Sequence, residues 1–83
     1  WMNCYPNPVR NILTMEVSVS VATRVLLMLL DESGRRIKTF DNGDKPKGSY
    51  QYYLNTSDLP QGIYFVVLKT HEDKRIAKVM VSR

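Results

Sequence analysis

A strict alternation of apolar and polar residues between Leu13 and Val21 is the feature that most limits how this chain can fold. The odd positions hold Leu, Met, Val, Val and Val, and the even positions hold Thr, Glu, Ser and Ser. A period of two places the apolar side chains on one face of an extended strand, whereas an amphipathic helix needs a period of about 3.6. This segment is therefore predicted to be a β-strand with one buried face.

The rest of the chain repeats this arrangement of short strands separated by turn-forming residues, and no segment has a helical period. Such a pattern, with a turn roughly every ten residues, is typical of a small antiparallel immunoglobulin-like β-sandwich of about seven strands. We therefore expect one all-β domain over residues 1–83. The further strands are predicted at 23–30, 35–40, 50–54, 63–69 and 75–81, with an additional candidate at 2–5.

Three connections have specific turn chemistry. Gly34 ends the run Asp-Glu-Ser-Gly and is free to take the positive φ of a tight hairpin turn. Residues 41–49 are dense in Asn, Asp, Gly and Pro and are predicted to form a polar loop. Pro60 and Gly62 predict a tight turn before an apolar strand, and the Tyr64 hydroxyl is expected to bond back across it as in a tyrosine corner.

Charge and hydropathy limit the partners that the domain is expected to have. Lys and Arg number 12 against 8 Asp and Glu, but the two signs are interspersed along the chain. This spacing is that of solvated strand faces rather than of a nucleic-acid-binding patch. The longest apolar run, residues 25–30, is far shorter than the roughly 18 residues that span a bilayer. We expect neither a nucleic-acid partner nor stable membrane insertion.

Residues suited to catalysis or metal binding are few. The one histidine, His71, lies in a predicted turn beside Glu72 and Asp73, and no second histidine completes a zinc motif. Cys4 is the one cysteine, so it has no partner for an internal disulfide, and nothing near it in sequence makes it a nucleophile. We expect no enzymatic activity and no cofactor.

Two groups of residues leave alternatives open at this point. Tyr50, Tyr52 and Tyr53 form either a stacking platform for sugars or an ordinary strand with one face inward. The platform corresponds to the alternative function, a non-catalytic adhesive or carbohydrate-binding module. Leu26 and Met28 lie on the face of their strand that should be wet, so they are either covered by a loop or form a patch that pairs with another protein. The oligomeric state remains open for the same reason.

The start of the chain contains two closely spaced prolines. Pro6 and Pro8 fix their own φ angles, and Pro8 disfavours helical backbone at Asn7. The segment Tyr-Pro-Asn-Pro at 5–8 is therefore predicted to be a stiff, extended lead-in to the domain.

Taken in order, these motifs resemble the C-terminal sorting domains of the bacterial type IX (Por) secretion system. The resemblance covers nearly the whole chain, from Tyr5 to Arg83, although Leu30 stands where the family often has Tyr, and Cys4 is not a regular feature. The family pattern has a YPNP opening, an Asp before a turn that ends in Gly, and a Leu-Pro-x-Gly-x-Tyr block. The matching residues are Tyr5, Pro6, Asn7, Pro8, Asp31, Gly34, Leu59, Pro60, Gly62 and Tyr64.

The resemblance implies a function in protein export. Such a domain directs an upstream cargo protein through the outer-membrane type IX translocon, after the cargo has crossed the inner membrane by an ordinary signal peptide. A sortase-like cysteine protease commonly removes the domain, and the cargo is then released or anchored. We accordingly expect a C-terminal piece of a larger secreted protein from a Gram-negative bacterium, in transit through the periplasm and then at the cell surface or outside the cell.

The last strand is the expected recognition element within this function. If it is an edge strand, its unpaired N–H and C=O groups are able to accept a strand of the translocon. The residues concerned are Lys78, Val79, Met80, Val81, Ser82 and Arg83.

Overall fold

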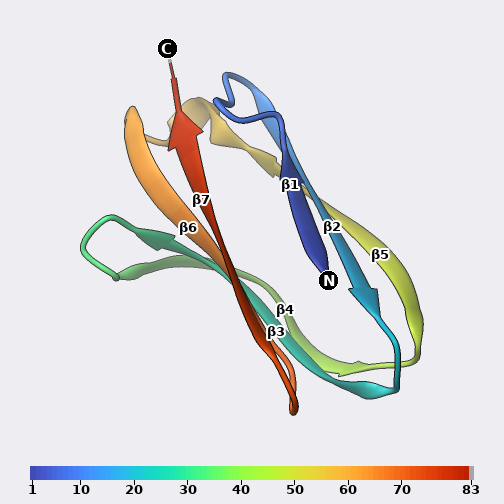
Figure 1. Cartoon of the computed structure of the whole chain (residues 1–83). Coiled ribbons are helices and arrows are strands. Elements are labelled where there is room, and N and C mark those ends of the chain that lie inside the picture. Colours follow the sequence, from blue (N-terminus) through green and yellow to red (C-terminus); the bar gives the residue numbers. More distant parts are fainter. Residues whose placement is uncertain (83) are drawn as a thin grey trace.

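Two antiparallel β-sheets pack face to face in the computed structural model, which describes residues 1–82 (Figure 1). One sheet has the strand order β1-β2-β5 and the other the order β4-β3-β6-β7. The prediction of a small antiparallel all-β sandwich is confirmed. The strands are β1 (Met2–Tyr5), β2 (Ile12–Val19), β3 (Thr23–Asp31), β4 (Arg36–Lys45), β5 (Gly48–Asn55), β6 (Gly62–Lys69) and β7 (Lys74–Val81).

The core lies between the two sheets and is built from the alternating apolar positions. In β2 the four odd residues from 13 to 19 are at most 8% exposed, and the residues between them are half-buried. The inward residues of β3, β6 and β7 belong to the same cluster. Burying one such side chain contributes about 1.5–3 kcal/mol, so the alternation itself accounts for the packing of the sheets. The core residues of β3 and β7 are Val25, Leu27, Leu29, Val79 and Val81.

The strand predicted for residues 13–21 is two residues too long at its C-terminal end. β2 ends at Val19, and Val21 is 53% exposed in the connection to β3. The polar–apolar pattern continues through Ser20 and Val21, but the chain must leave the sheet there to enter the second sheet. Periodicity alone does not mark that change of sheet.

The polar loop predicted at 41–49 is also wrong for most of its length. Residues 41–45 belong to β4 and pair with β3, for example Asn42 with Leu26 and Gly43 with Val25. Pairing with a long neighbouring strand overrides the turn-forming composition. Asp41 is held there by the Tyr52 hydroxyl and by an ion pair of 3.1 Å with Lys45.

The hairpin turn between β3 and β4 matches its prediction. Gly34 has a φ of 90°, and its N–H donates to the Asp31 carbonyl. The Asp31 carboxylate accepts hydrogen bonds from the Ser33 hydroxyl at 2.7 Å and from the Arg35 N–H at 2.9 Å. These two donors favour the ionised carboxylate and lower the pKa of Asp31.

Helical structure is limited to a single 3-10 turn, Thr56–Asp58, within the described residues. No helix in the described part of the chain has the length and apolar character that crossing a membrane requires.

Candidate recognition surface

Strand β7 is the last strand of its sheet, and the loop after β1 lies along the C-terminal half of its free edge (Figure 1). The Asn7 side-chain amide donates to the Lys78 carbonyl at 2.9 Å, and its oxygen accepts from the Met80 N–H at 3.0 Å. The Val9 backbone then accepts from the Ser82 N–H and donates to the Met80 carbonyl. Together, Asn7 and Val9 take the place of a neighbouring strand.

This geometry corrects the prediction of an extended lead-in at residues 5–8. Tyr5 is the last residue of β1, and residues 6–8 form a bend between β1 and β2, with cis peptide bonds before both Pro6 and Pro8. Proline has no N–H to donate to a sheet. The side chain of Asn7, between the two prolines, supplies a donor in place of the missing N–H groups, and its oxygen supplies an acceptor.

The outcome for the expected recognition segment differs from residue to residue. Val79 and Val81 are each 1% exposed and face the core, whereas Lys78 and Met80 are exposed on the outward face of the sheet. Ser82 is half-buried and bonded to Val9. Arg83 lies outside the described residues. β7 is an edge strand, as the prediction required. From the Lys78 carbonyl onward, however, its edge groups are already bonded to Asn7 and Val9 and are not free to pair with an added strand.

The N-terminal half of β7 has an open edge. Alternation along the strand directs the backbone groups of Ile76 away from β6, in the same sense as those of Met80. The Lys74 N–H donates to the Asp73 carboxylate. Within residues 1–82, nothing bonds to the Lys74 carbonyl, to the Ile76 N–H and C=O, or to the Lys78 N–H. The edge of β7 is thus closed at one end and open at the other.

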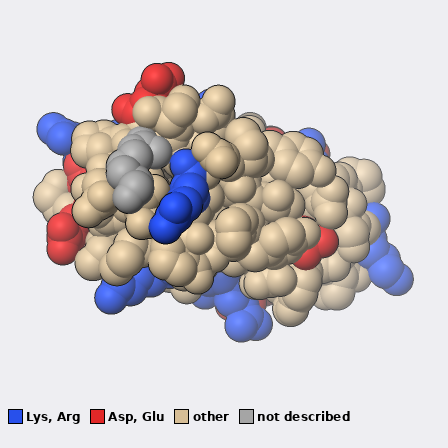
Figure 2. Space-filling model, turned by 90° about the horizontal axis from the view of Figure 1, so that it is seen from above, with Lys and Arg blue, Asp and Glu red and all other residues tan. Residues whose placement is uncertain are grey.

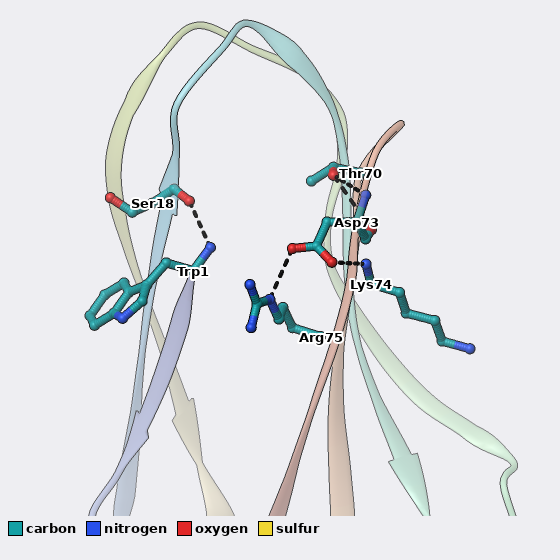
Figure 3. Close-up of polar contacts among 6 residues, drawn as sticks. All are labelled: Trp1, Ser18, Thr70, Asp73, Lys74 and Arg75. Carbon is teal, nitrogen blue, oxygen red and sulfur yellow. Dashed lines mark hydrogen bonds and ion pairs between the residues drawn. The ribbon is translucent and has the colours of Figure 1, made fainter.

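A small cavity of about 140 Å³ lies between the sheets beside this open half. Figure 3 shows Trp1 on the β1 side of this end of the sandwich and Asp73 and Arg75 together on the β7 side, with the Asp73 carboxylate bonded to Arg75. The Trp1 amino group donates to the Ser18 carbonyl at 3.1 Å, and Arg75 pairs with Asp73 at 2.9 Å. The hydrogen bonds from the Arg75 side chain and, second, from the Lys74 backbone N–H favour the ionised carboxylate and lower the pKa of Asp73.

The tyrosine corner is confirmed. The Tyr64 hydroxyl donates to the Pro60 carbonyl at 2.7 Å, Gly62 has a φ of 154°, and Tyr64 is 6% exposed. Gly62 pairs with Val81, so the corner fixes the start of β6 against the closed end of β7.

A second corner of the same kind escaped the sequence analysis. The Tyr50 hydroxyl donates to the Pro46 carbonyl, and Gly48 again has a φ of 154°. Both corners have the spacing Pro-x-Gly-x-Tyr, which was the available signal. It was missed because Pro46 and Gly48 were assigned to a loop and Tyr50 to the tyrosine group.

The proposed tyrosine platform does not form. Tyr50 and Tyr52 pack against the core, whereas Tyr53 is 60% exposed on the opposite face of β5. Burial and the neighbouring Asp41 carboxylate both raise the pKa of Tyr52. The three rings are therefore not available together for stacking on a sugar.

Leu26 and Met28 lie on the outward face of β3 and are half-buried. In β6 their register partners are Lys69 and Val67, so their neighbours are other side chains of the same sheet face. Val67 is only 2% exposed although it faces outward. The apolar side chains on this face thus shield one another.

Cys4 and His71 lie in different elements, a strand and an exposed turn. Burial raises the pKa of the Cys4 thiol to about 11, which keeps it protonated and weakly nucleophilic at neutral pH. Within residues 1–82, no three His, Cys, Asp or Glu side chains are grouped so that they could hold a metal ion. Figure 2 shows basic side chains at several places around this face, some of them along its lower side, and acidic side chains at other places.

Two antiparallel sheets around a single core, closed at the corners by tyrosine hydrogen bonds, define the class of small β-sandwich domains. A comparison with curated proteins finds no match. A family model described as the secretion system C-terminal sorting domain matches residues 3–82, nearly the whole chain. The chain belongs to this family of sorting domains and is a C-terminal sorting signal of the type IX secretion system, which exports proteins to the cell surface or beyond.

Proposed function

We propose that the domain directs an upstream cargo protein from the periplasm through the outer-membrane type IX translocon. The match to the sorting-domain family over residues 3–82 is the observation that supports this route most strongly. A sortase-like cysteine protease then removes the domain, and the cargo is released or anchored. The domain contributes recognition and no catalytic step of its own.

Within this function, we propose that the outward side chains of the terminal strand are what the translocon contacts. Lys78 and Met80 are exposed, while the backbone groups beside them are bonded to Asn7 and Val9. Recognition of this segment therefore rests on side chains rather than on addition of a strand. A stable fold is the condition for such recognition, because the two side chains are brought together only by the pleat of β7.

A fusion experiment tests the export function. Residues 1–83 are attached to the C-terminus of a periplasmic reporter in a host that has a type IX system, and surface reporter is measured by protease accessibility in intact cells. We expect surface reporter with the domain and none without it. A folded fusion that stays in the periplasm would contradict the proposal. The same fusion in a host lacking the translocon is the matched control.

A further inference from the structure

The open half of β7 combines free backbone groups with uncompensated positive charge. Four backbone groups point outward there without a partner in the described chain: the Lys74 carbonyl, the Ile76 N–H and C=O, and the Lys78 N–H. An exposed strand edge of this kind is a template for another strand. β1 lies beside β7, with Cα atoms of the two strands within 8 Å of each other, but its ladder is with β2 and, in the described part of the chain, it forms none with β7.

A row of outward side chains ends abruptly at this edge. Met28, Val67 and Ile76 are register partners across β3, β6 and β7. Val67 is 2% exposed because it has neighbours on both sides, whereas Ile76 is 58% exposed because no strand follows. An apolar side chain on an added strand, opposite Ile76, would continue the row and cover it.

Basic side chains surround Ile76 on the same face. Lys74 and Lys78 lie two residues before and after it, and Lys69 lies directly opposite Lys74. Like charges in directly opposed positions destabilise a sheet. The ion pairs of the described residues involve none of these three lysines. Acidic side chains on an added strand would relieve this repulsion.

We propose that the open half of β7 binds an extended protein segment that pairs as an added strand and carries the pattern acidic–x–apolar–x–acidic. The central apolar residue lies opposite Ile76. The N–H of each of these two residues donates to the carbonyl of the other, as in a hydrogen-bonded pair of antiparallel strands. The flanking acidic residues lie opposite Lys74 and Lys78. Asn7 and Val9 limit the added strand to about five residues, since they occupy the edge beyond Lys78.

A second copy of this domain fits the site poorly. Pairing two copies of the open half edge to edge would place Lys74 and Lys78 opposite lysines of the other copy. Charge complementarity therefore favours a different, acidic protein over self-association. This inference does not depend on the export function, because its test needs no secretion machinery. A negative result for peptide binding would not contradict the export function, and a negative export experiment would not contradict peptide binding.

The test uses a capped peptide, acetyl-Thr-Glu-Thr-Val-Thr-Glu-Thr-amide, titrated into the isotopically labelled 83-residue chain and followed by amide NMR shifts. We expect the shifts to be concentrated at residues 74–78 and the binding to be weaker in 0.5 M NaCl, because salt screens the attraction between the charges. A control peptide with Lys in place of Glu should bind at least tenfold more weakly. Equal binding of the two peptides, or no shifts with either, would overturn the proposal.

Two variants test the mode of binding on the folded chain. The double variant Lys74→Glu with Lys78→Glu should reverse the preference, so that the lysine peptide binds more tightly. The variant Ile76→Pro removes an outward N–H without touching the ladder to β6, and should abolish binding of the glutamate peptide. Unchanged preference in the double variant would overturn the proposal. Binding to anionic phosphatidylglycerol vesicles without binding to either peptide would also overturn the proposal.

Discussion

The two halves of β7 differ in what lies beside them, although they belong to one continuous strand. From Lys78 onward the outer edge is bonded to Asn7 and Val9, and the inward residues Val79 and Val81 are buried. Before Lys78 the edge is open, and Ile76 is 58% exposed. The closed half thus holds the sandwich together through its inward face and its edge, whereas the open half leaves edge groups unpaired within the described residues.

The largest expected effect is that of deleting residues 79–83. The deletion removes two buried valines, worth about 1.5–3 kcal/mol each, and three of the four hydrogen bonds to Asn7 and Val9, worth about 1 kcal/mol each. The sum is about 6–9 kcal/mol, comparable with the whole stability of a small domain. We expect loss of the β-sheet circular dichroism signal, and loss of export as a consequence. A truncated chain that still unfolds cooperatively would contradict the role given to the closed half.

The next effect concerns the corner that fixes the closed end. Gly62 pairs with Val81 and has a φ of 154°, which residues with a Cβ rarely adopt. Gly62→Val should lower the free energy of unfolding by about 1–3 kcal/mol, measured by urea denaturation. Gly43→Val is the matched control, because Gly43 lies in a strand without a positive φ and with open space around its Cβ position. Equal losses of unfolding free energy in the two variants would contradict the role given to Gly62 in the corner.

A smaller effect is expected at the edge itself. Asn7→Ala removes the two side-chain hydrogen bonds to Lys78 and Met80 and should cost about 1–2 kcal/mol. Amide exchange at Met80 should become about tenfold faster, since 1.4 kcal/mol corresponds to a factor of ten. Asn3→Ala is the control, because the Asn3 side chain makes no hydrogen bond within the described residues. Unchanged protection at Met80 would show that Asn7 does not close the edge.

The smallest effect belongs to the open half. Ile76→Thr should change the free energy of unfolding by less than about 0.5 kcal/mol, because Ile76 is mostly exposed. Val79→Thr introduces a hydroxyl at a position that is 1% exposed and should cost about 1–3 kcal/mol. Thermal unfolding of both variants measures the contrast. Similar losses in the two would remove the distinction between the halves.

Much of the fold was predictable from the sequence because the apolar positions alternate so regularly. Strand β2, the inward face of β7 and the corner at Tyr64 all follow from local patterns. The extension of β4 through residues 41–45 does not, because it depends on the length of β3 beside it. Local composition there favours turns, and only the tertiary pairing decides otherwise.

The candidate site was predictable only in part. The Tyr-Pro-Asn-Pro motif and the terminal strand were each identified, but their contact joins residues 71 and 73 positions apart in the chain. No periodicity links Asn7 to Met80, so the sequence did not show that the edge of β7 is already bonded from Lys78 to Ser82. The positive charge around Ile76 was not predictable for a similar reason, since Lys69 and Lys74 are opposed only through the register of β6 and β7.

The most direct test of recognition by the outward side chains of β7 separates recognition from folding at this strand. A surface reporter is fused to the domain carrying Lys78→Glu with Met80→Ser, two exposed outward positions whose backbone bonds to Asn7 are kept. We expect an unchanged urea midpoint for the domain and a fall of surface reporter to the level seen without the domain. Full export from the folded double variant would contradict recognition by these side chains.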